Sequence, residues 1–471
     1  MSEEKSILDS SQERLGKSLE KAKMGEDKGL AVLVRDLGER LVRILYGLLK
    51  MIELHDIENK AFDKPIVEFI EVGETLMNVL GALHIVTVED QVFVNDIRIR
   101  LNQAKGASTL SDELASHEIG GISFHMMPDA AGLKKFITLL AEDTKSDAPR
   151  ADLIVDLSEA GLDFIDLTGI YRFRISGEGA VTITRDMKKV SSRAANLVEE
   201  SWDNLGNNRV PNPLPLRRTV TDILKYSGDD VGGLLNDEKS STYGFHTLQV
   251  CRFALLMAQE LNLSDEAVQD LGLAAMFHDM GYSAREGADA QAGEEGFAPP
   301  FERHAVAGAR ILLKQRGFNQ AKIFRALSTL QHHYDYIHPN GTPSLFARII
   351  RIAEDYSNMI RLKGGYTPQE ALARMYAGSG TRYDPNIMQA FVNKMGKYPP
   401  GTLLEVEVNM KGRAMSFIMI ASSLVRSPET FDKPICKLIK LHDGRDAPAQ
   451  LANRPIDLAK RGTVKKVLSS I

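Results

Sequence analysis

The feature that most constrains this chain of 471 residues is a series of histidine and aspartate residues in its second half. The series comprises His246, the pair His278 and Asp279, His304, the pair His332 and His333, and Asp355. Successive groups are roughly 20 to 30 residues apart, which fits one helix and its connection. A histidine that only fills a core needs no such partners, whereas a metal site built by several helices needs inward-facing ligands from each. The series therefore predicts a metal site.

Apolar spacing places these residues on the buried faces of their helices. Val250 and Phe253 follow His246 at helical spacing, and Ile352 precedes Asp355 by three residues. The same spacing holds around the other members of the series. We therefore expect five helices to direct imidazole and carboxylate groups into one place.

The type and number of these side chains narrow the chemistry. Imidazole and carboxylate ligands suit divalent metals such as Fe, Mn, Ni or Zn. Seven ligands are too many for one ion that keeps positions open for a substrate, so two ions sharing a carboxylate are the economical arrangement. Such a pair suits the hydrolysis of phosphate esters, and a di-iron oxygen carrier or oxidase would use similar ligands. The ligand set alone leaves both classes open.

The ligand order and the flanking residues resemble the HD-GYP subgroup of the HD phosphohydrolase superfamily, over residues 215–425. Residues 271–281, LGLAAMFHDMG, are similar to the family's helix that ends in His-Asp, and residues 347–355, ARIIRIAED, to its last ligand helix. The resemblance implies an all-α HD-type bundle in which Asp279 bridges two divalent ions, Fe or Mn, and is catalytic. It also implies the two sets that complete the sites: His246, His278 and Asp355 for one ion, and His304, His332 and His333 for the other.

The resemblance implies a binuclear metal-dependent phosphodiesterase that hydrolyses cyclic di-GMP or a related cyclic dinucleotide in bacterial signalling. One alternative is a non-hydrolytic signalling module that keeps its metals and binds a nucleotide or a partner protein. Another is a phosphohydrolase that acts on a mononucleotide, an alarmone or another phosphate ester. Relatives that have become interaction modules often lose ligands, so the complete series favours an enzyme.

Three segments beside the ligands depart from the family pattern. Tyr282 stands where the HDxGK motif has its lysine, and residues 334–343 lack the family's Gly-Tyr pair. The RPYR segment corresponds to GGYT at residues 364–367, which has no arginine, so Arg361 or Lys363 would have to replace it. We therefore predict a retained metal centre with an altered nucleotide pocket, and Tyr282, Arg361 and Lys363 are the candidate substrate-binding residues.

Composition sets limits on compartment and partners. The net charge of -5 gives no reason to expect bulk nucleic acid or an anionic membrane as a partner. The sequence contains no signal peptide and no apolar run long enough to span a bilayer, and its two cysteines, Cys251 and Cys436, are far apart. These observations predict a reduced, cytoplasmic protein.

Pattern and composition predict a mainly α chain in five segments. They are a flexible arm (1–29), an α+β region (30–205), a proline-rich linker (206–216), the HD-GYP-like domain (217–400), and a small β segment with a C-terminal tail (401–471). In the α+β region, apolar spacing predicts a helix over 30–52, and the β-branched runs 84–88 and 92–99 predict a hairpin. Over residues 143–215 the apolar pattern does not clearly predict helices or strands. We expect the α+β region to sense a signal, to form a homodimer or to bind a signalling partner.

Overall fold

The computed structural model forms two compact units. The first comprises Met1–Gly177, Ser201–Arg218 and Arg310–Ile323, and the second Glu178–Glu200, Thr219–Ala309 and Phe324–Ile471. The structure describes residues 28–88, 91–99, 106–142, 146–170, 180–226, 243–283, 301–317, 320–361, 365–410, 413–452 and 454–469. The expected N-terminal arm lies outside these ranges except for its last two residues.

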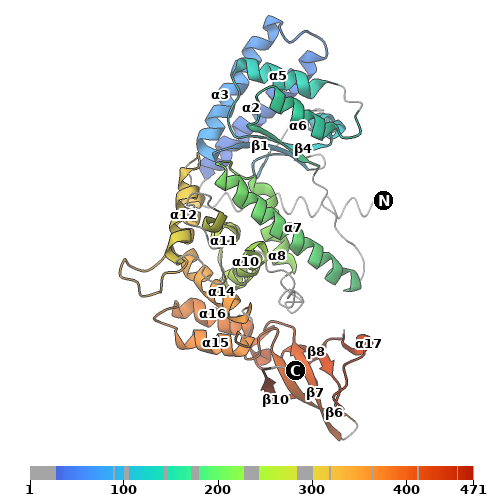
Figure 1. Cartoon of the computed structure of the whole chain (residues 1–471), viewed down its shortest axis with the longest axis vertical. Coiled ribbons are helices and arrows are strands. Elements are labelled where there is room, and N and C mark those ends of the chain that lie inside the picture. Colours follow the sequence, from blue (N-terminus) through green and yellow to red (C-terminus); the bar gives the residue numbers. More distant parts are fainter. Residues whose placement is uncertain are drawn as a thin grey trace, which may run out of the picture. The chain divides into compact units, whose positions relative to one another are not determined.

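An antiparallel sheet forms the centre of the first unit, with strand order β3-β2-β1-β4-β5. Helices α2, α3 and α5 pack together beside this sheet (Figure 1). The strands are β1 (Leu83–Val88), β2 (Gln91–Val94), β3 (Ile97–Arg98), β4 (Ile119–Phe124) and β5 (Ile165–Gly169). The helices are α2 (Lys28–Ile52), η1 (Lys60–Phe62), α3 (Asp63–Leu80), α4 (Gly106–Ser116), α5 (Ala130–Ala141) and α6 (Pro149–Glu159).

The sequence pattern explains why this unit folds as it does. The long apolar face of α2 buries Val34, Leu41 and Leu48 in the unit's core. The hairpin pairs Val86 with Phe93, so both predicted elements are confirmed. The tight turn after β2 places Asn95 at φ 56, a left-handed conformation that asparagine tolerates better than most residues.

The second unit contains the helical bundle. Its most buried helix is α10 (Tyr243–Glu260), which contacts α11 (Asp265–Phe277), α14 (Leu345–Arg361) and α16 (Pro385–Met395). Phe253, Tyr356 and Phe391 from three of these helices meet edge to face, with ring centroids 5.1 to 6.0 Å apart. The other elements of the helical region are α7 (Ala180–Gly206), α8 (Pro213–Tyr226), η2 (Met280–Ser283), α12 (Phe301–Lys314), α13 (Gln320–Gln331) and α15 (Pro368–Ala377).

The proline-rich segment contains more regular structure than its composition suggests. Helix α7 ends at Gly206 and α8 begins at Pro213, so Pro213 and Pro215 lie in the first turn of a helix. Proline is tolerated there because the first backbone N–H groups of a helix have no intrahelical partner. Residues Ser201–Arg218 belong to the first unit, whereas Thr219 begins a part of the second.

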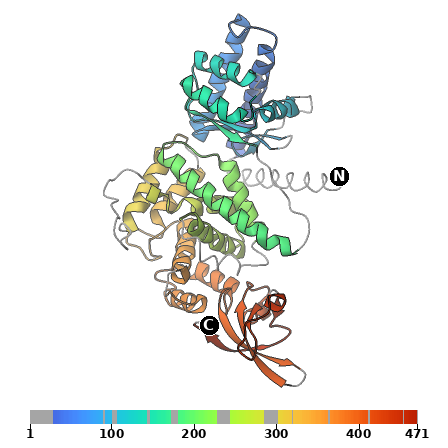
Figure 2. The ribbon, with the colours of Figure 1, turned by 45° about the vertical axis from the view of Figure 1, so that its right-hand side comes forward.

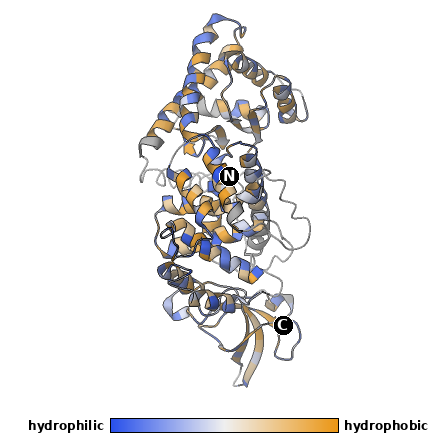
Figure 3. Cartoon of the chain, turned by 60° about the vertical axis from the view of Figure 1, so that its left-hand side comes forward, coloured by the Kyte–Doolittle hydropathy of each residue, from blue (hydrophilic) through white to orange (hydrophobic). Residues whose placement is uncertain are grey.

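A second antiparallel sheet follows the helices, with strand order β10-β6-β7-β8-β9 (Figure 2). Hydrophobic residues recur along its strands (Figure 3), and Leu404, Val406, Met419 and Leu438 form its core. Its elements are β6 (Leu403–Met410), β7 (Arg413–Ala421), η3 (Pro428–Thr430), β8 (Ile435–Lys440), α17 (Ala449–Ala452), β9 (Ile456–Asp457) and β10 (Thr463–Leu468). The predicted β segment is thus confirmed, and it extends into the region expected to be a tail.

Among the described residues, no helix is both long and apolar enough to cross a bilayer.

Candidate metal centre

Six of the seven predicted ligands lie together in the second unit. His246 lies on α10, His304 on α12, and His278 caps the C-terminal end of α11 with Asp279 next to it. His332 and His333 follow the last residue of α13. All six are buried except His333, which is partly buried. The series that was read from the sequence therefore converges in space, as far as His333.

Asp279 lies between two sets of histidines. Its Oδ1 is 3.2 Å from Nε2 of His304 and 3.5 Å from Nε2 of His332. Its Oδ2 is 3.4 Å from Nε2 of His278 and 3.9 Å from Nε2 of His246. Each oxygen of one carboxylate therefore faces a different set of imidazoles, which is the arrangement that a bridging ligand requires.

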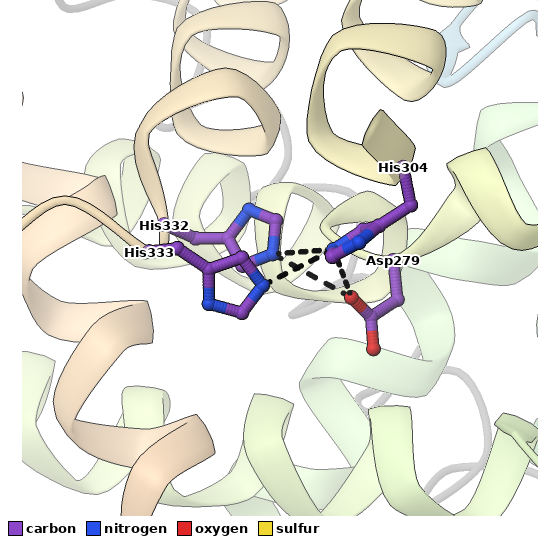
Figure 4. Close-up of side chains that lie close together, drawn as sticks. All are labelled: Asp279, His304, His332 and His333. Atoms are coloured by element: carbon purple, nitrogen blue, oxygen red, sulfur yellow. Dashed lines mark hydrogen bonds and ion pairs between the residues drawn. The ribbon is translucent and has the colours of Figure 1, made fainter. Parts of the chain in front are cut away.

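The set made by His304, His332 and His333 brings three imidazole nitrogens close together (Figure 4). Nε2 of His304 lies 3.1 Å from Nε2 of His332 and 3.2 Å from Nε2 of His333. Nε2 of His304 has either one lone pair or one proton, and neither can make good hydrogen bonds to both imidazoles and to the Asp279 carboxylate at once. Three nitrogens and one carboxylate oxygen around a single point form a suitable set of ligands for a cation, and their ligand atoms lie within 4.8 Å of one another.

Hydrogen bonds to the backbone determine which ring nitrogen bears the proton. Nδ1 of His278 is 2.7 Å from the carbonyl oxygen of Ala275, and Nδ1 of His332 is 2.7 Å from that of Thr329. A carbonyl oxygen can only accept, so Nδ1 donates in both rings and Nε2 carries the lone pair. Both lone pairs then face an Asp279 oxygen, and such a contact is repulsive unless a cation lies between the two acceptors.

His246 has the same tautomer for a different reason. The hydroxyl of Ser357 donates to Oε1 of Gln249 at 2.6 Å, which leaves the serine oxygen to accept from Nδ1 of His246 at 3.2 Å. Its Nε2 is therefore the lone-pair nitrogen as well. Partners of this kind, behind the ligands, commonly fix the orientation of metal-binding histidines.

Glu354, rather than Asp355, completes the second set. The groups of side chains that could hold an ion are Asp279 with His304, His332 and His333, and Asp279 with His246, His278 and Glu354. Oε2 of Glu354 is buried, has no hydrogen-bond partner and lies 4.0 Å from Nε2 of His332. The structure places Asp355 elsewhere: its Oδ2 accepts from the hydroxyl of Tyr383 at 2.8 Å. The sequence interpretation was thus one residue too far along α14.

A signal for Glu354 exists in the sequence. Ala347 lies seven residues before Glu354, Ile350 four residues before it, and Ser357 three residues after it. All three are fully buried, so helical spacing places Glu354 on a buried face. Asp355 follows Ile352 and Arg348 at similar spacing, so apolar periodicity alone did not distinguish the two carboxylates.

The electrostatics of the site favour bound cations. Burial lowers the pKa of His246 to about 3 and that of His278 to about 4, so both rings are neutral and can bind a metal at ordinary pH. Burial, followed by the charges of Asp279 and Asp355, raises the pKa of Glu354 well above its usual value. Burial also acts to raise the pKa of Asp279, but the nearby imidazoles of His278, His304 and His332 hold it well below its usual value.

Two glycines allow the elements of the site to approach closely. A Cβ atom on Gly281 would lie 1.9 Å from the carbonyl oxygen of His304, and one on Gly308 would lie 2.8 Å from a methyl group of Thr329. Helix α12 therefore packs directly against the turn that follows Asp279.

The predicted substrate-binding residues lie in different settings. The Tyr282 ring stacks with that of His304, with centroids 4.3 Å apart, and with that of Tyr243 at 5.4 Å. The Tyr282 ring therefore packs against a histidine of the cluster. A residue that only took the place of a phosphate-binding lysine would not need this contact. Arg361 is the last residue of α14 and is exposed, and Lys363 lies outside the described residues.

Sequence reasoning missed two arginines near the site. Nη1 of Arg351 lies 3.4 Å from Nδ1 of His333, and Nη2 of Arg382 lies 3.0 Å from Oδ2 of Asp355. Arg351 sits three residues before Glu354 on α14, which could have marked it as a neighbour of the site. Arg382 lies in a turn far along the chain, and no periodic pattern connects it with the ligands.

Comparisons with known proteins agree with this geometry. The HD domain family matches residues 243–359. The chain is 30% identical over 181 residues to the cyclic di-GMP phosphodiesterase PA4108 of Pseudomonas aeruginosa, covering 36% of this chain and 42% of that protein. It is 31% identical over 151 residues to the cyclic di-GMP phosphodiesterase response regulator RpfG of Xanthomonas campestris, covering 29% and 39%. The chain thus spans about two fifths of the length of these curated relatives.

A solved HDG"Y"P protein, Bd1817 of Bdellovibrio bacteriovorus, is 15% identical with a TM-score of 0.37 and covers 66% of this chain and 94% of that one. That level of similarity supports no further argument. The family match shows an HD domain over residues 243–359, and the two relatives and the ordered histidine and aspartate series agree with a domain of the HD-GYP type.

Proposed function

We propose that the chain is a metal-dependent phosphodiesterase that uses two divalent ions to hydrolyse a cyclic dinucleotide, with cyclic di-GMP as the first candidate. The observation that carries this proposal is the position of Asp279, whose two oxygens face two separate sets of histidine lone pairs. The names of the two relatives support the choice of substrate.

The available side chains suit two ions. His246, His278 and Glu354 would hold one ion, His304, His332 and His333 the other, and Asp279 would bridge them. Buried atoms without a hydrogen-bond partner, among them Nε2 of His278, Oδ1 of Asp279 and Oε2 of Glu354, support this assignment. When bound, such a pair supplies a hydroxide at neutral pH and neutralises the charge on a phosphate.

The protein's own contribution is to orient and desolvate these groups. The carbonyl oxygens of Ala275 and Thr329 hold the Nδ1 protons of His278 and His332, so Nε2 of each ring stays available. Tyr282 limits the rotation of His304 by stacking on it. Fe and Mn are the metals we propose, because both accept this mixture of imidazole and carboxylate.

A second candidate is a module that binds a nucleotide or a partner protein without hydrolysis. It is favoured by the Tyr282 stack, because a stacked phenol offers a phosphate neither the charge nor the reach of the lysine expected from the family pattern. We further propose that the first unit acts in sensing or self-association, and that residues 217–400 act as the catalytic domain.

Hydrolysis and metal content should be measured together on anaerobically purified full-length protein. We expect linear dinucleotide or GMP to form from cyclic di-GMP in the presence of Fe or Mn, and the Asp279→Asn variant to lose both metal and activity. Gln369→Ala is a suitable control, because the partly buried Gln369 side chain lies outside the cluster and bonds only the backbone of Lys397 among the described residues. A wild-type protein with full metal and tight cyclic di-GMP binding, but without turnover, would favour the second candidate.

A further inference from the structure

Asp355 gathers two arginines beside the metal centre. Its Oδ2 lies 3.3 Å from Nε of Arg351, 3.0 Å from Nη2 of Arg382 and 2.8 Å from the hydroxyl of Tyr383. Two guanidinium groups thus share one carboxylate oxygen. Asp335 also contacts Arg351, at 3.3 Å, but it is about half exposed, so solvent screens much of its charge.

Arg351 connects this cluster with the metal ligands. Its side chain is 10% exposed, and its Nη1 lies 3.4 Å from Nδ1 of His333. A buried cation beside a set of metal ligands is unfavourable unless an anion is also held there. Asp355 supplies one buried negative charge for two guanidinium groups, so Arg351 and Arg382 together keep the capacity to bind a further negatively charged ligand.

Metal binding would also change the partner of Arg351. A neutral imidazole carries one proton, so a His333 that binds an ion through Nε2 must carry its proton on Nδ1. That nitrogen could then no longer accept from Arg351. A guanidinium N–H would be left free to donate to another acceptor at the edge of the centre.

Arg382 is held at its backbone and open at its tip. The backbone N–H of Tyr336 donates to the carbonyl oxygen of Arg382, and that of Ile337 donates to Thr381, both at 2.9 Å. These bonds tie the turn that bears Arg382 to the loop that follows His333. The Arg382 side chain is 46% exposed, and its Nη2 contacts Asp355. The other N–H groups of its guanidinium can therefore donate to a ligand.

We propose that Arg351 and Arg382 form a binding subsite for phosphate oxygens next to the metal centre, and that Asp355 is the positioning residue that holds the two guanidinium groups together. Planar guanidinium donors match the spacing of phosphate oxygens, and paired arginines are suited to bind them in a bidentate way. This inference deepens the proposed function: it names residues that supply the cationic groups missing at positions 282 and 364–367.

The test uses the full-length, metal-loaded protein with two probes, inorganic phosphate and cyclic di-GMP. We expect Arg382→Gln to raise the dissociation constants of both probes 10-fold or more, while metal content and melting temperature stay as in wild type. Arg374→Gln is the matched control, since Arg374 is an exposed arginine of the same unit that packs over the Tyr366 ring at 4.2 Å. This control should bind both probes as wild type does.

Asp355 is tested by separating affinity from turnover. Asp355→Asn should weaken phosphate binding and raise KM more than it lowers kcat, and Asp355→Glu should restore part of the affinity. A purely structural ion pair would instead lower the melting temperature of both variants without changing phosphate affinity at full metal content. That result would overturn the assignment of Asp355 as a positioning residue for the subsite.

Two further outcomes separate this inference from the proposed function. Wild-type protein that fails to hydrolyse cyclic di-GMP, but binds inorganic phosphate in a way that Arg382→Gln weakens, would support the subsite and contradict the phosphodiesterase. Arg382→Gln protein that binds both probes as tightly as wild type would overturn the subsite, whatever the activity. Loss of metal from Arg382→Gln, or absence of phosphate binding by the metal-loaded wild type, would also overturn it.

Discussion

Glu354 and Asp355 are adjacent carboxylates on α14 with different surroundings. Glu354 has a buried oxygen without a hydrogen-bond partner near the histidines, whereas Asp355 is satisfied by Tyr383 and two arginines. An unpartnered buried carboxylate is costly, and a cation would remove that cost. This difference favours Glu354 over Asp355 as the candidate metal-binding carboxylate.

We therefore expect Glu354→Gln to lower bound metal by about 10-fold or more, in line with the loss of a direct ligand or its support. Asp355→Asn should keep its metal. Plasma mass spectrometry of the two variants, purified side by side under anaerobic conditions, gives the comparison. The reverse pattern, with metal lost from Asp355→Asn alone, would return the ligand role to Asp355.

Tyr282 allows a test of stacking against hydrogen bonding. Tyr282→Phe keeps the ring that lies 4.3 Å from His304 and removes only the hydroxyl, so it should retain metal and activity. Tyr282→Lys loses the stack, which is worth about 0.5–1.5 kcal/mol, and should weaken metal binding several-fold. Metal titration of both variants tests this. A higher rate of cyclic di-GMP hydrolysis in Tyr282→Lys would show that the residue faces the phosphate instead.

Among the elements, helices with one clear apolar face were the most predictable. The spacing of Val34, Leu41 and Leu48 predicted α2, and β-branched runs predicted the hairpin of β1 and β2. Helix α14 was harder, because residues on most of its circumference are buried and the period no longer selects one face. The short strand β9 and the strand β10 were missed, since β9 has only two residues and the adjacent lysines of Thr463–Leu468 interrupt the alternation of polar and apolar residues that marks a strand.

Strand β1 carries a buried histidine that gives the first unit a pH dependence. His84 is 1% exposed, and its Nδ1 lies 2.8 Å from Oγ of Ser123. Burial lowers the pKa of His84 to about 3. The unfolded chain binds this proton near pH 6.5, so the stability contributed by the neutral ring is complete above pH 6.5 and is lost as the pH falls towards 3.

We expect the free energy of unfolding of the first unit to fall by about 2 kcal/mol between pH 7 and pH 5, at about 1.4 kcal/mol for each pH unit below 6.5. Trp202, the single tryptophan, is buried in that unit and reports its unfolding in urea by fluorescence. His84→Gln is the control and should reduce the pH dependence. An unchanged slope in this variant would assign the effect to other groups.

At the scale of the whole molecule, the sequence predicted the residues of the candidate metal centre better than it predicted the fold around them. Residue type and order were sufficient to group His246, His278, Asp279, His304 and the histidine pair, because metal ligands must converge whatever the connections between them. Residues that meet only through tertiary structure could not be found in this way. Arg382 reaches Asp355 from a turn between α15 and α16, and local periodicity contains no trace of that contact.

The division into units was also beyond the sequence. The first unit combines Met1–Gly177 with two later segments, Ser201–Arg218 and Arg310–Ile323. Prolines between residues 206 and 216 suggested a linker, but proline in the first turn of a helix has the same local signature. Whether such prolines belong to a linker or to the start of a helix depends on how distant segments pack, and composition does not encode that packing.

The central claim is a centre of two ions bridged by Asp279. The most direct measurement is the number of metal ions per chain in the full-length protein, purified without oxygen and compared with Asp279→Asn. The arrangement of the two histidine sets around one carboxylate predicts two ions in wild type and a marked loss of both in the variant. One ion per wild-type chain, or two ions retained by Asp279→Asn, would contradict the account.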